Sequence, residues 1–264
     1  EKGIHAVLKT EQKLLSYAPL KLKGESLRGN TVTVKNYEEK ESKSHPKNLY
    51  NLTDIYKEAD KKFKANTTIV QKHIQDLYDS GYITYPRSDS RHLPLSRLDK
   101  VRDSFNKLSL NDRYTALTNL IDPAVINEKH SAFNDEKVTA HYAITPTSKV
   151  YEHGGRPELE QKLYDLIVKR FLGKFMPSAI YKVRKVTLID AEGEEYFVSE
   201  RLLKDPGYLS VFKEEVDENT KQVFTLPEVL EGQSLVVESY EIIEGKTRKP
   251  PLHNAPSILT FMEN

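Results

Sequence analysis

The chain has 264 residues, a formal net charge of +1 at neutral pH and no cysteine. The lack of cysteine excludes a disulfide framework and a thiolate metal site, and no apolar run approaches the roughly 20 residues that a bilayer span needs. We therefore expect a soluble, cytoplasmic protein without a secretory signal.

The two ends of the chain have a β pattern. Residues 4–37 mix β-prone runs with Gly24 and Gly29, which indicates strands and turns. Glu38 to Lys47 is charged and contains Pro46, so it is predicted to be a linker and a domain boundary. Later β-prone runs are Ile180 to Ile189, Glu195 to Ser199, Gln222 to Leu226 and Ser234 to Ile243.

The middle of the chain has helical periodicity. Leu52, Ile55, Ala59 and Phe63 share one face of a first helix, for which Thr53 is the expected N-cap. Asn66 or Thr67 is expected to cap a second helix that ends at Gly81. Its apolar stripe comprises Ile69, Val70, His73, Ile74, Leu77 and Tyr78. Further helices are predicted from Leu95 to about Leu108 and from Pro157 to Gly173.

A short strand from Tyr82 to Tyr85 is expected after the second helix, which is the element order of a winged helix-turn-helix. The predicted fold is therefore α+β, with a mainly helical, winged-helix-like domain inserted into an antiparallel β domain. The helical domain takes residues 49–179, and the β domain takes 1–48 and 180–250. Residues 251–264 begin a following segment, so we interpret the chain as a fragment.

Tyr85 is the most distinctive candidate for chemistry. Pro86 pushes Tyr85 into an extended conformation at a strand end, next to the polar loop Arg87-Ser-Asp-Ser90. A guanidinium at Arg87 binds phosphate bidentately and supplies the positive field that a phenol with a pKa near 10 needs in order to attack. The alternatives are a packed tyrosine, one of 15 in the chain, and a solvated surface arginine.

Two further positions are candidates for the same site. Asp89 either holds the Arg87 guanidinium through paired hydrogen bonds or caps the turn with Ser88 and Ser90. His141 borders the apolar pair Ala143 and Ile144, so a catalytic and a packed histidine are equally compatible with the pattern. No metal site is predicted, because the 8 histidines show no short paired spacing.

The sequence resembles the type IA DNA topoisomerases, and the bacterial topoisomerase III branch in particular. Four segments carry the resemblance in the order of the family. They are Leu49-Tyr-Asn-Leu-Thr-Asp54, Gly81-Tyr-Ile-Thr-Tyr-Pro-Arg-Ser-Asp-Ser90, Lys137-Val-Thr-Ala-His-Tyr-Ala-Ile-Thr-Pro-Thr147, and Lys249-Pro-Pro-Leu252 running into Phe261-Met-Glu-Asn264. Tyr56 stands where the family pattern has glutamine, so it is assigned no DNA contact.

The resemblance implies an enzyme that cleaves and reseals one DNA strand through a 5′-phosphotyrosine on Tyr85, without a nucleoside triphosphate. It implies that Arg87 stabilises the transition state and that Ser88, Asp89 and His141 contribute to DNA binding. The implied fold is a toroid in which a β arch carries the tyrosine domain. The fragment would hold no cofactor, because Mg²⁺ would bind the parent enzyme through a domain that precedes this region.

We expect the partner to be DNA, chiefly single-stranded, and the fragment to be monomeric and inactive alone. The alternative interpretation is a winged-helix DNA-binding module in which Tyr85 only packs or stacks on a base. A third interpretation, a partner-docking fragment, follows from the nearly neutral charge and predicts no salt-dependent DNA binding.

Overall fold

The computed structural model divides the chain into a β unit and a helical unit, which confirms the α+β class and the insertion of helices into a β unit. The residues that it describes are 3–8, 17–212, 225–243, 245, 249–250 and 252–263. The β unit comprises Glu1–Ser44, Ala179–Asp205 and Glu218–Pro250. The helical unit comprises His45–Ser178, Pro206–Asp217 and Pro251–Asn264.

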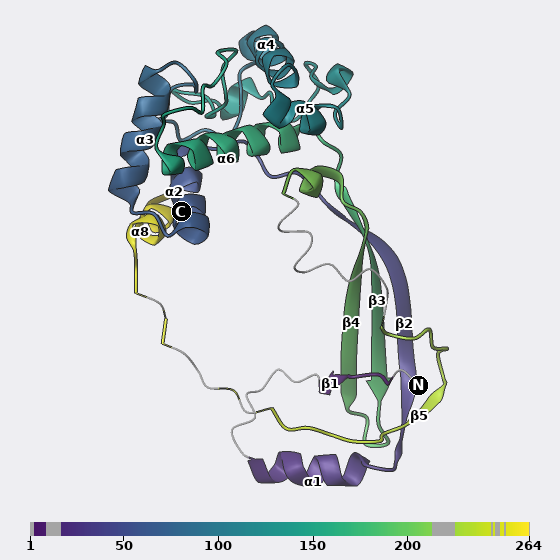
Figure 1. Cartoon of the computed structure of the whole chain (residues 1–264). Helices are drawn as coiled ribbons and strands as arrows, with labels where there is room; N and C mark the ends of the chain where they lie inside the picture. Colours follow the sequence, from purple (N-terminus) through teal and green to yellow (C-terminus); the bar gives the residue numbers. More distant parts are fainter. Residues whose placement is uncertain are drawn as a thin grey trace. The chain divides into compact units, whose positions relative to one another are not determined.

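An antiparallel sheet with strand order β1-β4-β3-β2-β5 forms the β unit, and Figure 1 shows its long central strands. The strands are β1 (Val7–Leu8), β2 (Thr31–Ser44), β3 (Ala179–Ile189), β4 (Glu195–Asp205) and β5 (Ser234–Val236). The strand predicted over 234–243 is shorter in the structure, where β5 ends at Val236. Of the predicted strand over 222–226, residues 222–224 lie outside the described residues, and 225–226 form no strand.

The predicted linker over 38–47 is wrong for residues 38–44, because β2 continues to Ser44 in register with β3. Residues 45–47 form no strand, and the boundary between the two units falls after Ser44. The charged side chains of β2 are paired across the strands. Glu39 accepts from Lys182 at 2.5 Å and from Arg184 at 2.6 Å, and Lys204 donates to Glu41 at 2.6 Å. Cross-strand pairs of opposite charge stabilise a sheet, so a charged run that resembles a linker forms a strand here.

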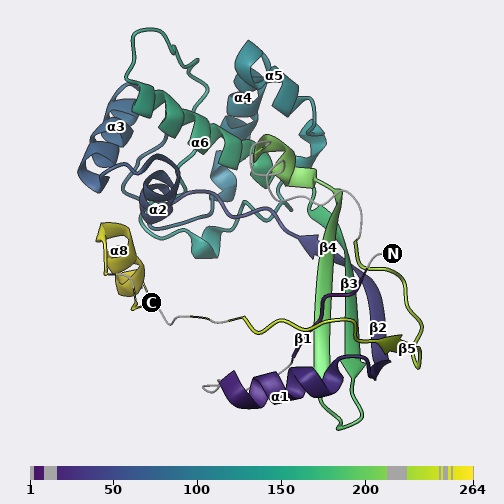
Figure 2. The same cartoon turned by 60° about the horizontal axis from the view of Figure 1, so that its bottom comes forward.

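Helix α1 (Tyr17–Leu27) replaces the strands and turns expected in this part of residues 4–37. Proline is tolerated in the first turn of a helix, where Pro19 lies, because the backbone N–H groups there have no partner within the helix. A Cβ on Gly24 would lie 2.2 Å from the Tyr240 ring, so the glycine allows a close approach. Lys23 joins the helix to the turn after β3 through Asp190 at 2.9 Å. Figure 2 shows α1 beside this turn between β3 and β4.

The helical unit confirms the predicted helices. They are α2 (Leu52–Phe63), α3 (Thr67–Asp79), α4 (Leu98–Ser109) and α6 (Glu158–Lys174), and the unit also contains α5 (Asp112–Thr118) and α8 (Ala255–Glu263). Short 3-10 turns lie at Leu95–Arg97, Pro123–Val125, Asp135–Lys137 and Gly207–Phe212. Leu163, Tyr164, Ile167 and Phe171 of α6 are fully buried and form the centre of the core.

The helix ends differ from expectation at one cap. Asn51, rather than Thr53, caps α2 by accepting from Asp54 N at 2.9 Å, while the expected Asn66 caps α3. Gly81 ends α3 with a φ of +75°, and Tyr82 N donates to Leu77 O at 2.9 Å. This pair of features is a Schellman motif, which leads the chain directly from α3 to Tyr85.

We expect Gly81→Ala to destabilise the protein by about 1 kcal/mol, because a Cβ is disfavoured in the left-handed conformation. Urea unfolding of the two proteins measures the difference. Gly154→Ala is the control, since Gly154 has ordinary backbone geometry and open space around it. Equal losses in both variants would contradict the structural role of Gly81.

Candidate active site

Residues 82–84 and 145–147 lie side by side and form the base of the site. Thr84 N donates to Thr145 O, and Thr147 N donates to Tyr82 O, both at 2.9 Å. The predicted strand over 82–85 is wrong in extent, since the pairing is one isolated bridge between Ile83 and Pro146. The ladder does not extend further, because Tyr82 N donates to Leu77 O and Thr145 N donates to the Thr84 hydroxyl instead of pairing with the backbone across the bridge.

The loop after Tyr85 is held by buried polar contacts from three motif segments. Ser88 is buried, and its hydroxyl donates to the backbone oxygen of His141 at 3.1 Å. Leu52 N donates to Ser88 O, and the Asn51 side chain donates to Asp89 O, each at 3.1 Å. The Ser88 hydroxyl, expected at the DNA, therefore lies in the interior and holds the loop against the His141 segment.

The Tyr85 ring is held between two other rings. Its centroid lies 5.5 Å from Tyr78 in an edge-to-face arrangement and 4.3 Å from His141 in a tilted one. Tyr85 is half-buried and His141 is exposed. Aromatic pairs at such distances restrict a ring without enclosing it. Packing thus fixes the direction of the phenol and leaves part of the residue accessible.

Arg87 is exposed on the same loop, and its positive charge extends to Tyr56 on α2. Burial raises the pKa of Tyr56, and the Arg87 guanidinium opposes that rise. In the described part of the chain, no hydrogen bond or ion pair joins Arg87 to Asp89. The arginine is therefore available to an anion from solution.

Asp89 caps the turn, which is one of the two roles that the sequence left open. Its carboxylate accepts from the Thr139 hydroxyl at 2.6 Å. That hydrogen bond, together with the backbone N–H groups of Asp89 and Ser90, lowers the pKa of the carboxyl group. The exposed carboxylate thus connects the Tyr85 loop to the segment that carries His141.

We expect Thr139→Val to raise the pKa of Asp89 toward its ordinary value near 3.9, because the variant removes the main hydrogen bond to the charged form. A lowered carboxyl pKa contributes stability above the unfolded-state pKa, and this stability is lost as the pH falls through the folded-state pKa. The variant should therefore lose less stability on acidification below about pH 4. NMR titration of the Asp89 carboxyl measures the shift. Thr139→Ser keeps the hydroxyl, and a rise of the same size in that control would contradict the explanation.

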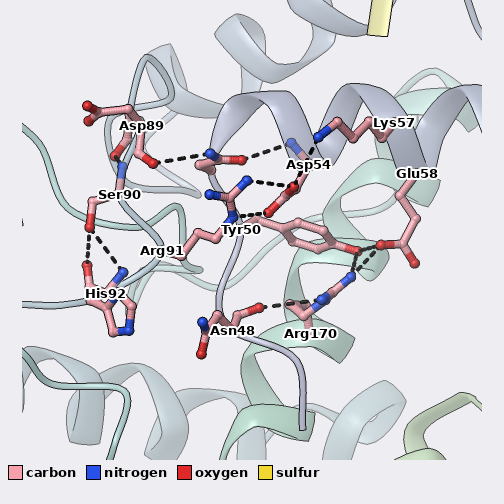
Figure 3. Close-up of polar contacts among 12 residues, drawn as sticks. Asn48, Tyr50, Asp54, Lys57, Glu58, Asp89, Ser90, Arg91, His92 and Arg170 are labelled. Atoms are coloured by element: carbon pink, nitrogen blue, oxygen red, sulfur yellow. Dashed lines mark hydrogen bonds and ion pairs between the residues drawn. The ribbon is translucent and has the colours of Figure 1, made fainter. Parts of the chain in front are cut away.

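Sequence reasoning missed the contacts that join this loop to α2 and α6. Arg91 donates to both oxygens of Asp54, at 2.6 Å and 3.0 Å. Tyr50, Glu58 and the buried Arg170 form a second hydrogen-bonded cluster beside this pair (Figure 3). The sequence carried a signal for the contact between the loop and α2. Asn51 stands immediately before α2, where asparagine is a preferred cap, and its side chain also donates to Asp89 O of the loop.

One cluster of possible metal ligands was not predicted. Nδ1 of His73 lies 3.8 Å from Asp76 Oδ2 and 3.7 Å from Glu160 Oε2, although α3 and α6 are far apart in sequence. Arg156 donates to the other oxygen of the buried Glu160 at 2.6 Å. That guanidinium balances the buried carboxylate, so we interpret the cluster as an ion-pair network between helices.

Comparison with known proteins places the chain among the DNA topoisomerases. The family described as DNA topoisomerase matches residues 8–264. The chain is 47% identical to DNA topoisomerase 1 of Bacillus anthracis over 261 residues, which are 99% of this chain and 30% of that protein. It is 31% identical to DNA topoisomerase 3 of Bacillus licheniformis over 242 residues, which are 90% of this chain and 33% of that protein. The chain thus spans about a third of these relatives.

A solved structure also matches. Full-length topoisomerase I of Thermotoga maritima aligns with a TM-score of 0.71 and 21% identity, covering 98% of this chain and 41% of that one. This likeness confirms the fold. Among the described residues, no helix is both long and apolar enough to cross a membrane. The relatives carry the names topoisomerase 1 and topoisomerase 3, so the topoisomerase III-like subtype stays a prediction. The chain belongs to the type IA DNA topoisomerase family.

Proposed function

We propose that Tyr85 is the nucleophile with which the whole enzyme cleaves one DNA strand. The phenol gives up its proton and its oxygen attacks the phosphorus, and the displaced 3′ oxygen takes up a proton and leaves as a hydroxyl. The 5′ phosphate stays on Tyr85, and attack by the same 3′ hydroxyl reverses the exchange. The observation that supports this proposal is the half-buried ring, which Tyr78 and His141 hold in place on the loop that carries the exposed Arg87.

The other residues have distinct roles in the proposed reaction. Arg87 stabilises the charge that develops on the phosphate oxygens, and His141 contacts a neighbouring phosphate. Ser88 and Asp89 position the loop, through the His141 backbone and through Thr139. Exchange of one phosphodiester for another is nearly balanced in energy, so positioning and charge stabilisation suffice and no nucleoside triphosphate is needed.

The residues around Tyr85 do not fit a Mg²⁺ site. Asp89 is the nearby exposed carboxylate in the described loop, and Thr139 already donates to it. Mg²⁺ prefers an octahedral set of oxygen ligands, commonly with one or two carboxylates and several waters. We therefore assign the Mg²⁺ expected for the parent enzyme to residues beyond this chain.

The proposal extends to the setting of the reaction. The substrate is DNA with a single-stranded segment, and the outcome is relaxation or decatenation. The enzyme acts in the cytoplasm, associated with the nucleoid, as a monomer. The helical unit presents Tyr85, and the β unit is part of the arch that carries it.

Covalent trapping tests the proposal in the intact protein. A single-stranded oligonucleotide labelled at its 3′ end is incubated with the protein and Mg²⁺, and the reaction is stopped with detergent. The label should remain on the protein, because the released fragment is the one with the free 3′ hydroxyl. Mass spectrometry should place the adduct on Tyr85. Salt-dependent DNA binding without any adduct would favour the winged-helix binding module.

A further inference from the structure

A cleft of about 440 Å³ opens beside α2 in the helical unit. Six cationic side chains line it against two carboxylates, Asp54 and Glu58. The cations are Lys47, Lys57, Lys61, Lys62, Arg91 and Arg170. Figure 3 draws Lys57, Arg91 and Arg170 of this set together with the two carboxylates. This excess of positive charge in a concave surface attracts anions more strongly than isolated lysines on a flat surface do.

The two carboxylates do not neutralise the cleft. Asp54 accepts from Nε and Nη2 of Arg91, and Glu58 pairs with Arg170 and Tyr50. Lys57 and Lys62 also approach these carboxylates, at 3.9 Å and 3.8 Å. Since six cations line the cleft against two carboxylates, the net charge of its lining is positive.

Arg170 provides a rigid part of the cleft wall. It is buried, and its Nη1 donates to Asn48 O at 3.4 Å. Lys174 donates to the Asn48 side chain at 3.0 Å, so the Asn48 segment is fixed from α6. A wall whose side chains are already ordered loses little further entropy when it binds a ligand.

The cleft is connected to Tyr85 through one short loop. Arg91 lies six residues after Tyr85, so their Cα atoms are separated by at most about 20 Å. Asp89, between them, is tied to the Asn51 cap of α2. A strand bound at Tyr85 needs only a few nucleotides to reach the cleft.

We propose that this cleft binds backbone phosphates of the single DNA strand that Tyr85 attacks. The inference rests on the proposed function and names a second contact for the same strand. The cleft is much larger than one phosphate needs, and its lysines suit a backbone because each acts as a point charge with no base preference. Its role is to anchor the strand next to the reacting phosphate, without contributing to the chemistry.

The double variant Lys57→Gln/Lys61→Gln tests the cleft in the intact protein. Anisotropy of a fluorescent oligothymidine measures affinity at several salt concentrations. Each lost phosphate contact should reduce the slope of log K against log salt by about 0.7, so the double variant should lose about 1.4. The control is Lys72→Gln/Lys107→Gln, which removes the same charge from exposed positions on α3 and α4 outside the cleft.

The proposal predicts a reduced slope for the cleft pair and an unchanged slope for the control. Equal reductions of the slope in both pairs would mean that the total charge of the protein, rather than the cleft, causes the effect. An unchanged slope in the cleft pair would exclude the site. Titration with inorganic phosphate alone distinguishes a small-anion site, which would hold phosphate tightly and leave the DNA slope intact. Tyr85→Phe should keep the wild-type slope. The slope therefore tests the cleft, and adduct formation tests the proposed chemistry at Tyr85, so a failure of one is distinguished from a failure of the other.

Discussion

Tyr85→Phe in the intact enzyme is expected to lower strand cleavage by at least about 10⁴-fold, because the variant removes the attacking oxygen. The ring itself should stay in place, since its contacts with Tyr78 and His141 involve the aromatic faces and edges. Denaturing gels of 3′-labelled DNA measure the adduct, and relaxation of supercoiled plasmid measures turnover. DNA affinity should change little.

Tyr78→Phe is the matched control for this variant. It removes a hydroxyl from the neighbouring ring and preserves the aromatic packing against Tyr85. Adduct formation in this control should stay within a few-fold of the wild type. If Tyr85→Phe still formed adducts at the wild-type rate, another residue would be the nucleophile and the proposed function of Tyr85 would be wrong.

Arg87→Ala is expected to lower the cleavage rate by about 10² to 10³-fold, which is the usual effect of removing one donor to a developing oxyanion. The affinity for single-stranded DNA should fall much less, because the variant leaves the other 39 lysines and arginines of the chain in place. Single-turnover cleavage at saturating DNA measures the rate, and anisotropy measures the binding.

Two other variants separate the geometry of Arg87 from its charge. Arg87→Lys keeps the charge and loses the bidentate fork, so it should have an intermediate rate. Arg102→Ala removes an arginine with a half-exposed side chain on α4 and should cleave normally. Equal losses of binding and of cleavage in Arg87→Ala would place the arginine in ground-state binding and exclude a transition-state role.

The helices were predictable because their signals are local. In α3 the cap Asn66, the terminating Gly81 and the buried Val70, Ile74 and Leu77 follow from spacings of three and four residues. The predicted stripe was too wide at one position, since Ile69 is 51% exposed. Periodicity determines which side chains share a face, but the width of the buried surface depends on what packs against it.

The extent of the strands depended on partners distant in sequence. Residues 38–44 have linker composition and become part of β2 because β3 and β4 supply opposite charges. Residues 82–85 have strand composition and form only a bridge, because Tyr82 N donates to Leu77 O and Thr145 N donates to the Thr84 hydroxyl. In both places the partners of the chain, rather than its local propensity, decided the outcome.

The sequence by itself determined the candidate chemistry, since Tyr85, Pro86 and Arg87 are adjacent and their character depends on their own side chains. Only the tertiary structure decided their surroundings. It buried the Ser88 hydroxyl, placed the His141 ring on Tyr85 and gave the Asp89 carboxylate to Thr139 rather than to Arg87. These contacts join positions about 50 residues apart, and packing selects them among many partners of similar chemistry.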